Sequence, residues 1–149
     1  EAVLRESNMH VPGTDGGKMS KSKNNTIDVF LPEKQLRKQV MSIATDSTPL
    51  EQPKNHDNCT VFSLYSMIAD EDAVKNMRQQ YESGGFGYGH AKQALFEALL
   101  DKFSIARAQF NKYREDPKRM DQILQQGAIK AQSVANETLY RVRKSLGFY

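Results

Sequence analysis

The chain has 149 residues, a formal net charge of +3, and 38% hydrophobic and 26% charged residues. A domain of this length can bury about 70% of the surface that its unfolded chain exposes, so a hydrophobic core is possible. No run of about 18 apolar residues occurs, which argues against a membrane-spanning helix. The single Cys59 excludes an internal disulfide and fits a cytoplasmic location, and the mild positive charge is compatible with RNA or nucleotide partners.

The first half of the chain is predicted to consist of loops and short helices. Residues 13–26 are expected to form a loop, because Gly, Ser, Asn and Lys dominate them. A helix should begin at Pro32, since proline is tolerated at the first helical position and Glu33 suits the positive end of the helix dipole. Its apolar stripe comprises Leu36, Val40 and Ile43. Residues 45–58 are too polar for a strand and are predicted to form a long connection.

Two further short helices are expected between this connection and a glycine-rich break at residues 83–89. The first begins near Thr60, and the second begins after Asp70, whose side chain is a typical N-cap. Spacings of three and four residues place Val74, Met77 and Tyr81 on the inner face of the second helix.

The last part of the chain predicts two long helices. One covers residues 90–115, and Asp116 followed by Pro117 supplies the N-cap and first position of the next, which should end before Gly147. Both carry apolar residues at spacings of three and four, which predicts an antiparallel pair with both stripes in the core. The stripes are Leu95, Leu99, Phe103, Ala106, Phe110 and Tyr113, and then Met120, Leu124, Gly127, Ala131, Ala135, Thr138, Val142 and Leu146.

The densest cluster of chemically active residues is Lys18-Met19-Ser20-Lys21-Ser22, which follows the glycine-rich residues 13–17. Lysine ammonium groups, hydroxyl groups and the backbone amides of a glycine-rich loop are groups that bind polyphosphates. A P-loop is excluded, because aligning its Gly-Lys pair on Gly17 and Lys18 places Pro12 at its first glycine and Met19 at its Ser/Thr. A solvated basic turn is the alternative interpretation.

The five residues from Lys18 to Ser22 resemble the KMSKS signature of class I aminoacyl-tRNA synthetases. The resemblance covers essentially the whole chain and is to the C-terminal part of bacterial-type tryptophanyl-tRNA synthetases. It continues through residues 24–27, 32–38 and 45–49, through Gly87, Tyr88, Gly89 and Lys92, and through the final helices. Tyrosyl-tRNA synthetases share the architecture and are the nearest alternative, but the stretch from Asp46 to Pro49 looks more like the tryptophanyl enzymes.

The resemblance implies that this loop binds the phosphates of ATP, with Mg²⁺ accompanying the nucleotide as substrate and with no prosthetic group. Lys21 and Lys18 would follow the negative charge that builds on the leaving pyrophosphate, so they would contribute most in the transition state. Ser20 and Ser22 would contact phosphate or fix the loop, and Met19 would be its apolar anchor.

The resemblance also implies the partners of an intact enzyme: tryptophan, ATP and tRNA(Trp), in a cytoplasmic homodimer without membrane attachment. The nucleotide-binding α/β domain of the family, with its tryptophan pocket, has no counterpart in this sequence. We therefore expect the chain to be a piece of a longer ligase that does not activate tryptophan by itself. The dimer surface would lie mostly on that other domain, so the piece is expected to be monomeric.

The turn between the two last helices is a candidate for tRNA binding. The residues gathered there are Lys112, Tyr113, Arg114, Lys118 and Arg119. Cations that follow a phosphate backbone, beside a ring that can stack on a base, are typical of RNA-binding surfaces. Cations that complement a helix dipole are the structural alternative, and a non-catalytic helical RNA-binding module is the alternative function.

Together these patterns predict an all-α fold, a helical bundle of the anticodon-binding type that ends in the long helix pair. A mobile KMSKS loop, left from the absent α/β domain, would precede it. The expected division places residues 1–26 in the tail of the catalytic domain and residues 27–149 in the anticodon-binding domain. The three histidines, His10, His56 and His90, lack metal-ligand spacing, so no metal site is predicted.

Overall fold

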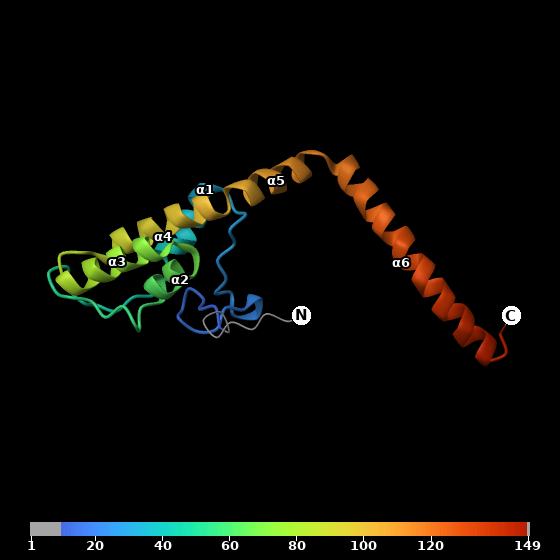
Figure 1. The fold of residues 1–149 in the computed structure, drawn as a ribbon, viewed down its shortest axis with the longest axis horizontal. Helices are drawn as coiled ribbons and strands as arrows, with labels where there is room; N and C mark the ends of the chain where they lie inside the picture. The colour runs from blue at the N-terminus through green and yellow to red at the C-terminus, as the bar shows by residue number, and fades with distance from the viewer. Residues whose placement is uncertain (1–9, 149) are drawn as a thin grey trace. The chain divides into compact units, whose positions relative to one another are not determined.

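The computed structural model describes residues 10–148, so the first nine residues of the expected catalytic-domain tail (1–26) lie outside the described part. In the described part the regular secondary structure is helical, apart from one isolated antiparallel bridge between Pro12 and Lys18, and loops connect the helices. The elements shown in Figure 1 are the 3-10 turn η2 (Lys21–Lys23) and the helices α1 (Glu33–Met41), α2 (Thr60–Ile68), α3 (Glu71–Ser83), α4 (Tyr88–Lys102), α5 (Ser104–Glu115) and α6 (Pro117–Ser145). The predicted all-α class is confirmed.

The chain divides into two compact units, one ending at Arg107 and the other beginning at Ala108. The first unit contains the lysine-serine loop and helices α1 to α4, and the second contains the end of α5 and all of α6. The division expected from the family resemblance, between residues 26 and 27, concerns a longer enzyme and stays a prediction.

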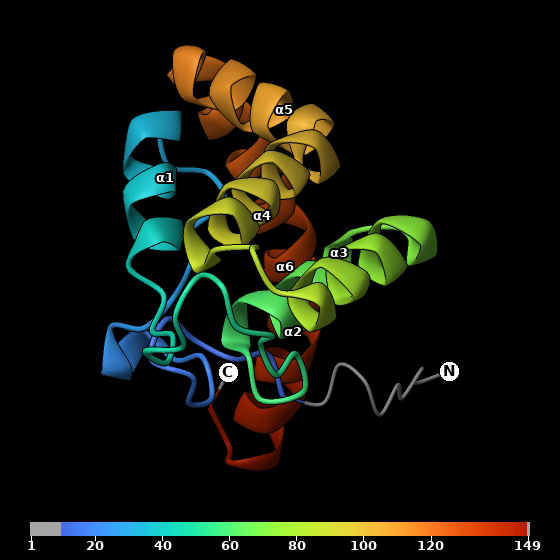
Figure 2. The same cartoon turned by 90° about the vertical axis from the view of Figure 1, so that its left-hand side faces the viewer.

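The core of the first unit forms where α4 packs against both α1 and α2, while α3 packs against α2, as Figure 2 shows. Leu36 and Val40 of α1, Met77 and Tyr81 of α3, and Leu95 of α4 each expose 3% or less of their surface. Burying a side chain of this size stabilises the fold by about 1.5–3 kcal/mol. The inward faces that the three- and four-residue spacings predicted for these helices are therefore confirmed.

The predicted helix ends are also confirmed at three places. Asp70 caps α3, since its Oδ1 accepts a hydrogen bond from the amide of Ala73 at 2.8 Å. Asp116 caps α6 in the same way, with the amide of Arg119 donating at 3.0 Å. Beyond α6, Gly147 has a φ of +78°, the left-handed conformation in which glycine ends helices without strain.

The single helix predicted over residues 90–115 is wrong, because α4 ends at Lys102 and α5 begins at Ser104. Between them Phe103 has φ −102° and ψ 10°, outside regular helical geometry. Its ring packs against the hydrophobic core, and we attribute the break to this contact. Neither glycine nor proline marks the position, so the hydrophobic spacing continues across it without interruption.

The expectation that the apolar stripe of α6 lies in the core is wrong for this chain. The described residues of α6 are all exposed; Leu124 exposes 63% of its surface and Leu146 exposes 67%. Helical spacing shows that a face is suited to burial, but it does not supply a surface to bury that face against. No helix among the described residues combines the length and the apolar character that a membrane crossing needs.

Candidate functional site

The lysine-serine loop is closed by backbone hydrogen bonds at its base. The amide of Met19 donates to the carbonyl of Val11 at 2.9 Å, and the amide of Thr14 donates to the carbonyl of Asn25 at 2.9 Å. The turn between these contacts passes through Gly16, whose φ of +80° favours glycine. These bonds bring residues 11 to 25 into one compact loop.

The groups that the sequence predicted to bind phosphate lie on the surface of this loop. Lys18, Lys21 and Ser22 are exposed, and Ser20 is half-buried with its Oγ 2.9 Å from the Oγ of Ser22. Neither lysine forms an ion pair with a residue in the described part of the chain. The two ammonium groups are therefore open to an anionic ligand.

Met19 lies on the apolar side of the loop. It is half-buried and lines a cavity of about 280 Å³ whose wall is almost entirely apolar. The other lining residues include Ile27, Val29, Leu64, Leu95 and Leu99. This is the placement expected of an apolar anchor between the exposed lysines.

Asn25 connects the two ends of the loop, a role that the sequence did not predict. Its Nδ2 donates to Oδ1 of Asp15 at 2.7 Å, and the amide of Gly17 donates to the same oxygen at 3.0 Å. These bonds, the one from Asn25 first, hold the pKa of the Asp15 carboxyl below its usual value. The only sequence signal was that Asn25 falls inside the stretch that resembles the family.

Hydrogen bonds join the loop to the helices through the connection that follows α1. The amide of Ala44 donates to the carbonyl of Thr14 at 2.7 Å. Two residues further on, Asp46 accepts from the hydroxyl of Tyr88 at 2.8 Å and from the amide of Thr48 at 2.9 Å. Bonds from Thr48 and then Tyr88 lower the pKa of Asp46, whereas burial and the bond to Asp46 raise the pKa of Tyr88 to about 12.

Two further lysines near this connection serve the fold. Lys54 exposes only 4% of its surface, and its Nζ donates to the carbonyls of Pro49 at 2.9 Å and Gln52 at 3.2 Å. Lys92 donates to the carbonyl of Met41, the last residue of α1, at 3.1 Å, and burial lowers its pKa. Their ammonium groups donate to backbone carbonyls. Nothing in the sequence distinguishes these two lysines from exposed ones.

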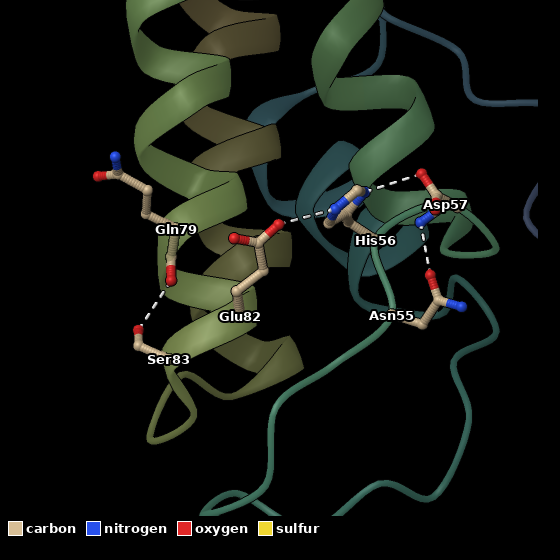
Figure 3. Close-up of polar contacts among 6 residues, drawn as sticks. All are labelled: Asn55, His56, Asp57, Gln79, Glu82 and Ser83. Atoms are coloured by element: carbon tan, nitrogen blue, oxygen red, sulfur yellow. Dashed lines mark hydrogen bonds and ion pairs between the residues drawn. The ribbon is translucent and has the colours of Figure 1, made fainter.

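His56 also has a structural role, as Figure 3 shows. Its Nε2 lies 3.1 Å from Oε1 of Glu82 on α3, and its Nδ1 lies 3.0 Å from Oδ1 of Asp57. The imidazole thus links the connection before α2 to α3. Within residues 10–148 no three His, Cys, Asp or Glu side chains form a group that could hold a metal ion.

The predicted RNA-binding residues belong to the second unit, around the junction of α5 and α6. The guanidinium group of Arg119 stacks over the ring of Tyr113 at 5.8 Å, and that of Arg114 stacks over Phe110 at 5.7 Å. Lys112 and Arg114 occupy the last turn of α5, where cations complement the helix dipole. Lys118 and Arg119 occupy the first turn of α6, where the dipole disfavours cations, so helix stability does not explain them.

Comparison with known proteins places these features in a family. The family model described as tRNA synthetases class I (W and Y) matches residues 3–104. The chain belongs to this family. The family predicted from the KMSKS resemblance is therefore confirmed.

Tryptophan–tRNA ligases are the relatives that cover this chain. The ligase of Campylobacter jejuni is 45% identical over 99% of this chain and 46% of its own length. The ligase of Fusobacterium nucleatum is 40% identical over 99% of this chain and 45% of its own length. The chain thus spans about half the length of the relatives it matches, and these relatives favour the tryptophanyl over the tyrosyl interpretation.

A solved structure agrees with the sequence comparison. The crystal structure of the tryptophanyl-tRNA synthetase from Campylobacter jejuni, complexed with ADP and tryptophan, superposes with a TM-score of 0.90 at 44% identity. It covers 99% of this chain, which covers 46% of that one. The helical fold described above is therefore that of a tryptophanyl-tRNA synthetase over the matched half.

Proposed function

We propose that this chain supplies the ATP-phosphate-binding loop and the tRNA-binding helices of a tryptophan–tRNA ligase. Such a ligase joins tryptophan to tRNA(Trp) and converts ATP to AMP and pyrophosphate. The observation that carries the proposal is the loop of residues 18–22, whose lysines are exposed and without ion-pair partners in the described part of a chain that belongs to this family.

The chemistry assigned to the loop follows from its charge. The tryptophan carboxylate attacks the α-phosphate of ATP, and negative charge builds on the pyrophosphate that leaves with Mg²⁺. One lysine ammonium group at about 4 Å from a phosphate oxygen attracts it by about 4 kcal/mol at an effective dielectric constant of about 20. Because Lys18 and Lys21 project from a loop, they can follow this charge as it develops, which lowers the barrier rather than the energy of the bound substrate.

The remaining partners follow from the relatives. The similar crystal structure from Campylobacter jejuni contains ADP and tryptophan. This supports ATP and tryptophan as ligands of a ligase that contains this chain. We assign the tryptophan pocket and the main dimer surface to a nucleotide-binding α/β domain of the enzyme. The boundary between the tail of that catalytic domain and the anticodon-binding domain is assigned to residue 26. Within this proposal the enzyme is cytoplasmic and homodimeric, and the piece alone is inactive.

The tRNA contact is assigned to the junction of α5 and α6. Lys118 and Arg119 are unfavourable for the dipole of α6, but they suit a phosphate backbone. Tyr113 carries Arg119 over its ring at 5.8 Å, which places a stacking surface beside a cation. Proteins use this combination of an aromatic ring and a cation to bind single-stranded RNA loops.

A hybrid ligase tests the catalytic part of the proposal. The N-terminal part of the Campylobacter jejuni ligase would be joined to this chain, which replaces the matching C-terminal part, and ATP–pyrophosphate exchange would be measured. We expect exchange with tryptophan and not with tyrosine, and a loss of about a hundredfold to a thousandfold for Lys21→Ala. Lys34→Ala, which removes an exposed lysine of α1, is the matched control. Undiminished exchange in the Lys18→Ala/Lys21→Ala hybrid would overturn the proposal.

Binding of tRNA(Trp) to the 149-residue chain tests the second part. We expect the affinity for tRNA(Trp) to fall as the salt concentration rises. Arg119→Ala should weaken binding and reduce the slope of log affinity against log salt concentration by about one, the change expected when one phosphate contact is lost. Lys130→Ala, on the same helix but away from the junction, is the control. Equal losses from both substitutions would contradict a site at the junction. Retained RNA binding by a hybrid without exchange would favour the non-catalytic module instead.

A further inference from the structure

Asn25 is one of two buried polar or charged side chains in the described part of the chain, the other being Lys54. It exposes 2% of its surface. Its Oδ1 accepts from the amide of Ser20 at 2.7 Å, and its Nδ2 donates to the carbonyl of Lys18 at 3.1 Å and to Oδ1 of Asp15 at 2.7 Å. Both the oxygen and the nitrogen of the side-chain amide therefore have hydrogen-bond partners in the loop, as buried polar groups require.

These bonds act on the backbone that carries the lysines. The Lys18 carbonyl and the Ser20 amide lie on either side of Met19, so one side chain fixes the chain direction across that residue. Lys18 is bonded directly, and Lys21 follows Ser20 immediately. An amide group can make this pair of contacts because it combines an acceptor and a donor, and a carboxylate or an apolar side chain of the same size cannot.

The packing of Gly13 is a second and independent observation. A Cβ atom at Gly13 would lie 2.4 Å from Cγ and Nδ2 of Asn25, closer than real atoms approach. Gly13 is itself buried. The next residue, Thr14, also contacts Asn25, because its amide donates to the Asn25 carbonyl at 2.9 Å. The first glycine of the loop thus leaves the space that the Asn25 side chain occupies.

We propose that Asn25 is a positioning residue of the phosphate-binding loop, which directs Lys18 and Lys21 toward the nucleotide phosphates without touching the nucleotide. This inference rests on the proposed function of the loop. Asn25 also binds the exposed Asp15 carboxylate, because its Nδ2 donates to Oδ1 of Asp15. The lowered pKa of Asp15, whose first cause is the bond from Asn25, agrees with that arrangement.

The contact itself is tested in the 149-residue chain by amide hydrogen exchange. Asn25→Ala removes the acceptor of the Ser20 amide, so we expect exchange at Ser20 to accelerate about tenfold or more, since protection reports local opening. Asn24→Asp is the matched control, because the neighbouring Asn24 is exposed and its φ of +52° lies in the left-handed region, which Asp also tolerates. Equal protection of Ser20 in both variants would overturn the inference.

The kinetic consequence is tested in the hybrid ligase with Asn25→Asp. The new carboxylate faces the Lys18 carbonyl and the Asp15 carboxylate, so the loop is misplaced while the core remains. We expect kcat of ATP–pyrophosphate exchange to fall about a hundredfold, the loss typical of small displacements, with KM for tryptophan unchanged. Asn24→Asp adds the same charge one residue away and should change kcat less than about threefold, as expected for an exposed position.

Two further comparisons separate positioning from general damage. In the Lys21→Ala background, Asn25→Asp should cost much less than in the parent, because a positioning residue acts through the group it positions. The exchanged pair Asp15→Asn/Asn25→Asp restores a donor opposite an acceptor at that contact and should recover part of kcat. The exchanged pair also decides the question if circular dichroism shows that Asn25→Asp alone is unfolded.

The outcomes distinguish the two levels of the proposal. If Lys18→Ala/Lys21→Ala leaves exchange undiminished, the proposed function of the loop fails. If Lys21→Ala lowers exchange but a folded Asn25→Asp retains the parent kcat, the positioning role fails while the proposed function stands. Full additivity of Asn25→Asp and Lys21→Ala would also overturn the positioning role.

Discussion

The hydroxyl group of Tyr88, the first residue of α4, donates a 2.8 Å hydrogen bond to the carboxylate of Asp46 in the connection that follows α1. The ring of Tyr88 also lies 5.4 Å from the ammonium group of Lys54. The lysine-serine loop joins the same connection through the bond between Thr14 and Ala44. The segment between α1 and α2 is therefore held from both sides, by the loop and by α4.

Removing the Tyr88 hydroxyl should weaken this connection. Tyr88→Phe leaves the Asp46 carboxylate with one donor fewer, and we expect the free energy of unfolding to fall by about 1–2 kcal/mol, toward the lower end of values for bonds to charged groups. Urea denaturation measures the change. Tyr65→Phe, on α2, is the matched control, because no hydrogen bond joins the Tyr65 hydroxyl to another residue in the described part of the chain. Equal effects of the two substitutions would contradict a specific role for the bond.

Stability should fall in acid through Asp15 and Asp46. Hydrogen bonds lower the pKa of both carboxyls below the usual value of 3.8 in the folded state, so the unfolded chain binds protons first. Their stabilisation is therefore complete above the unfolded pKa and is lost as the pH falls through the lower folded pKa. The urea concentration at the midpoint of unfolding should fall as the pH is lowered from about 5 to about 2. Asp46→Asn should make this dependence of stability on pH less steep. An unchanged slope in Asp46→Asn would show that the carboxyl does not contribute.

Lys54 should be essential to the local fold in spite of its charge. Lys54→Met keeps the apolar stem but leaves carbonyls, including those of Pro49 and Gln52, without their donor. We expect a loss of about 2–3 kcal/mol in unfolding free energy, because buried acceptors lose a charged partner. Lys75→Met, which breaks only the exposed 3.4 Å ion pair with Asp72, should change stability by less than about 0.5 kcal/mol. Comparable losses from both variants would show that burial of Lys54 carries no advantage.

Two leucines at the same helical spacing should differ sharply. Leu95 exposes 1% of its surface and Leu124 exposes 63%. Leu95→Ala should destabilise the 149-residue chain by about 2–5 kcal/mol, the range for a leucine removed from a core. Leu124→Ala should change stability by no more than about 0.5 kcal/mol, since exposed positions contribute little. A large loss in Leu124→Ala, measured by thermal or urea unfolding, would show that α6 buries its apolar face in solution.

Local chemistry made much of this protein predictable from sequence. The Asp70 and Asp116 caps, the proline after Asp116 and the glycine after α6 act within one turn of chain, so neighbouring residues specify them. The burial predicted for the apolar stripe of the first helix was also correct, because Leu36, Val40 and Ile43 pack in the hydrophobic core. The lysine-serine loop was identified from its own residues, and the family assignment followed from it.

Other features depend on contacts between residues far apart in the chain. The break at Phe103 and the roles of Lys54 and Lys92 required knowledge of what lies opposite each side chain. The stripe of α6 has the same spacing as that of α4, yet Leu124 of α6 is exposed while Leu95 of α4 is buried. Spacing determines which residues share a face, and tertiary packing determines whether that face is buried.

The sequence by itself determined the all-α class, most helix positions and the cationic loop, because hydrophobic period, capping residues and turn residues are written locally along the chain. Only the tertiary structure decided that Asn25 enters the space left by Gly13 and bonds both sides of Met19. The physical reason is that a buried amide takes its function from the donors and acceptors that folding brings to it. Its position in the sequence names the residue but not its partners.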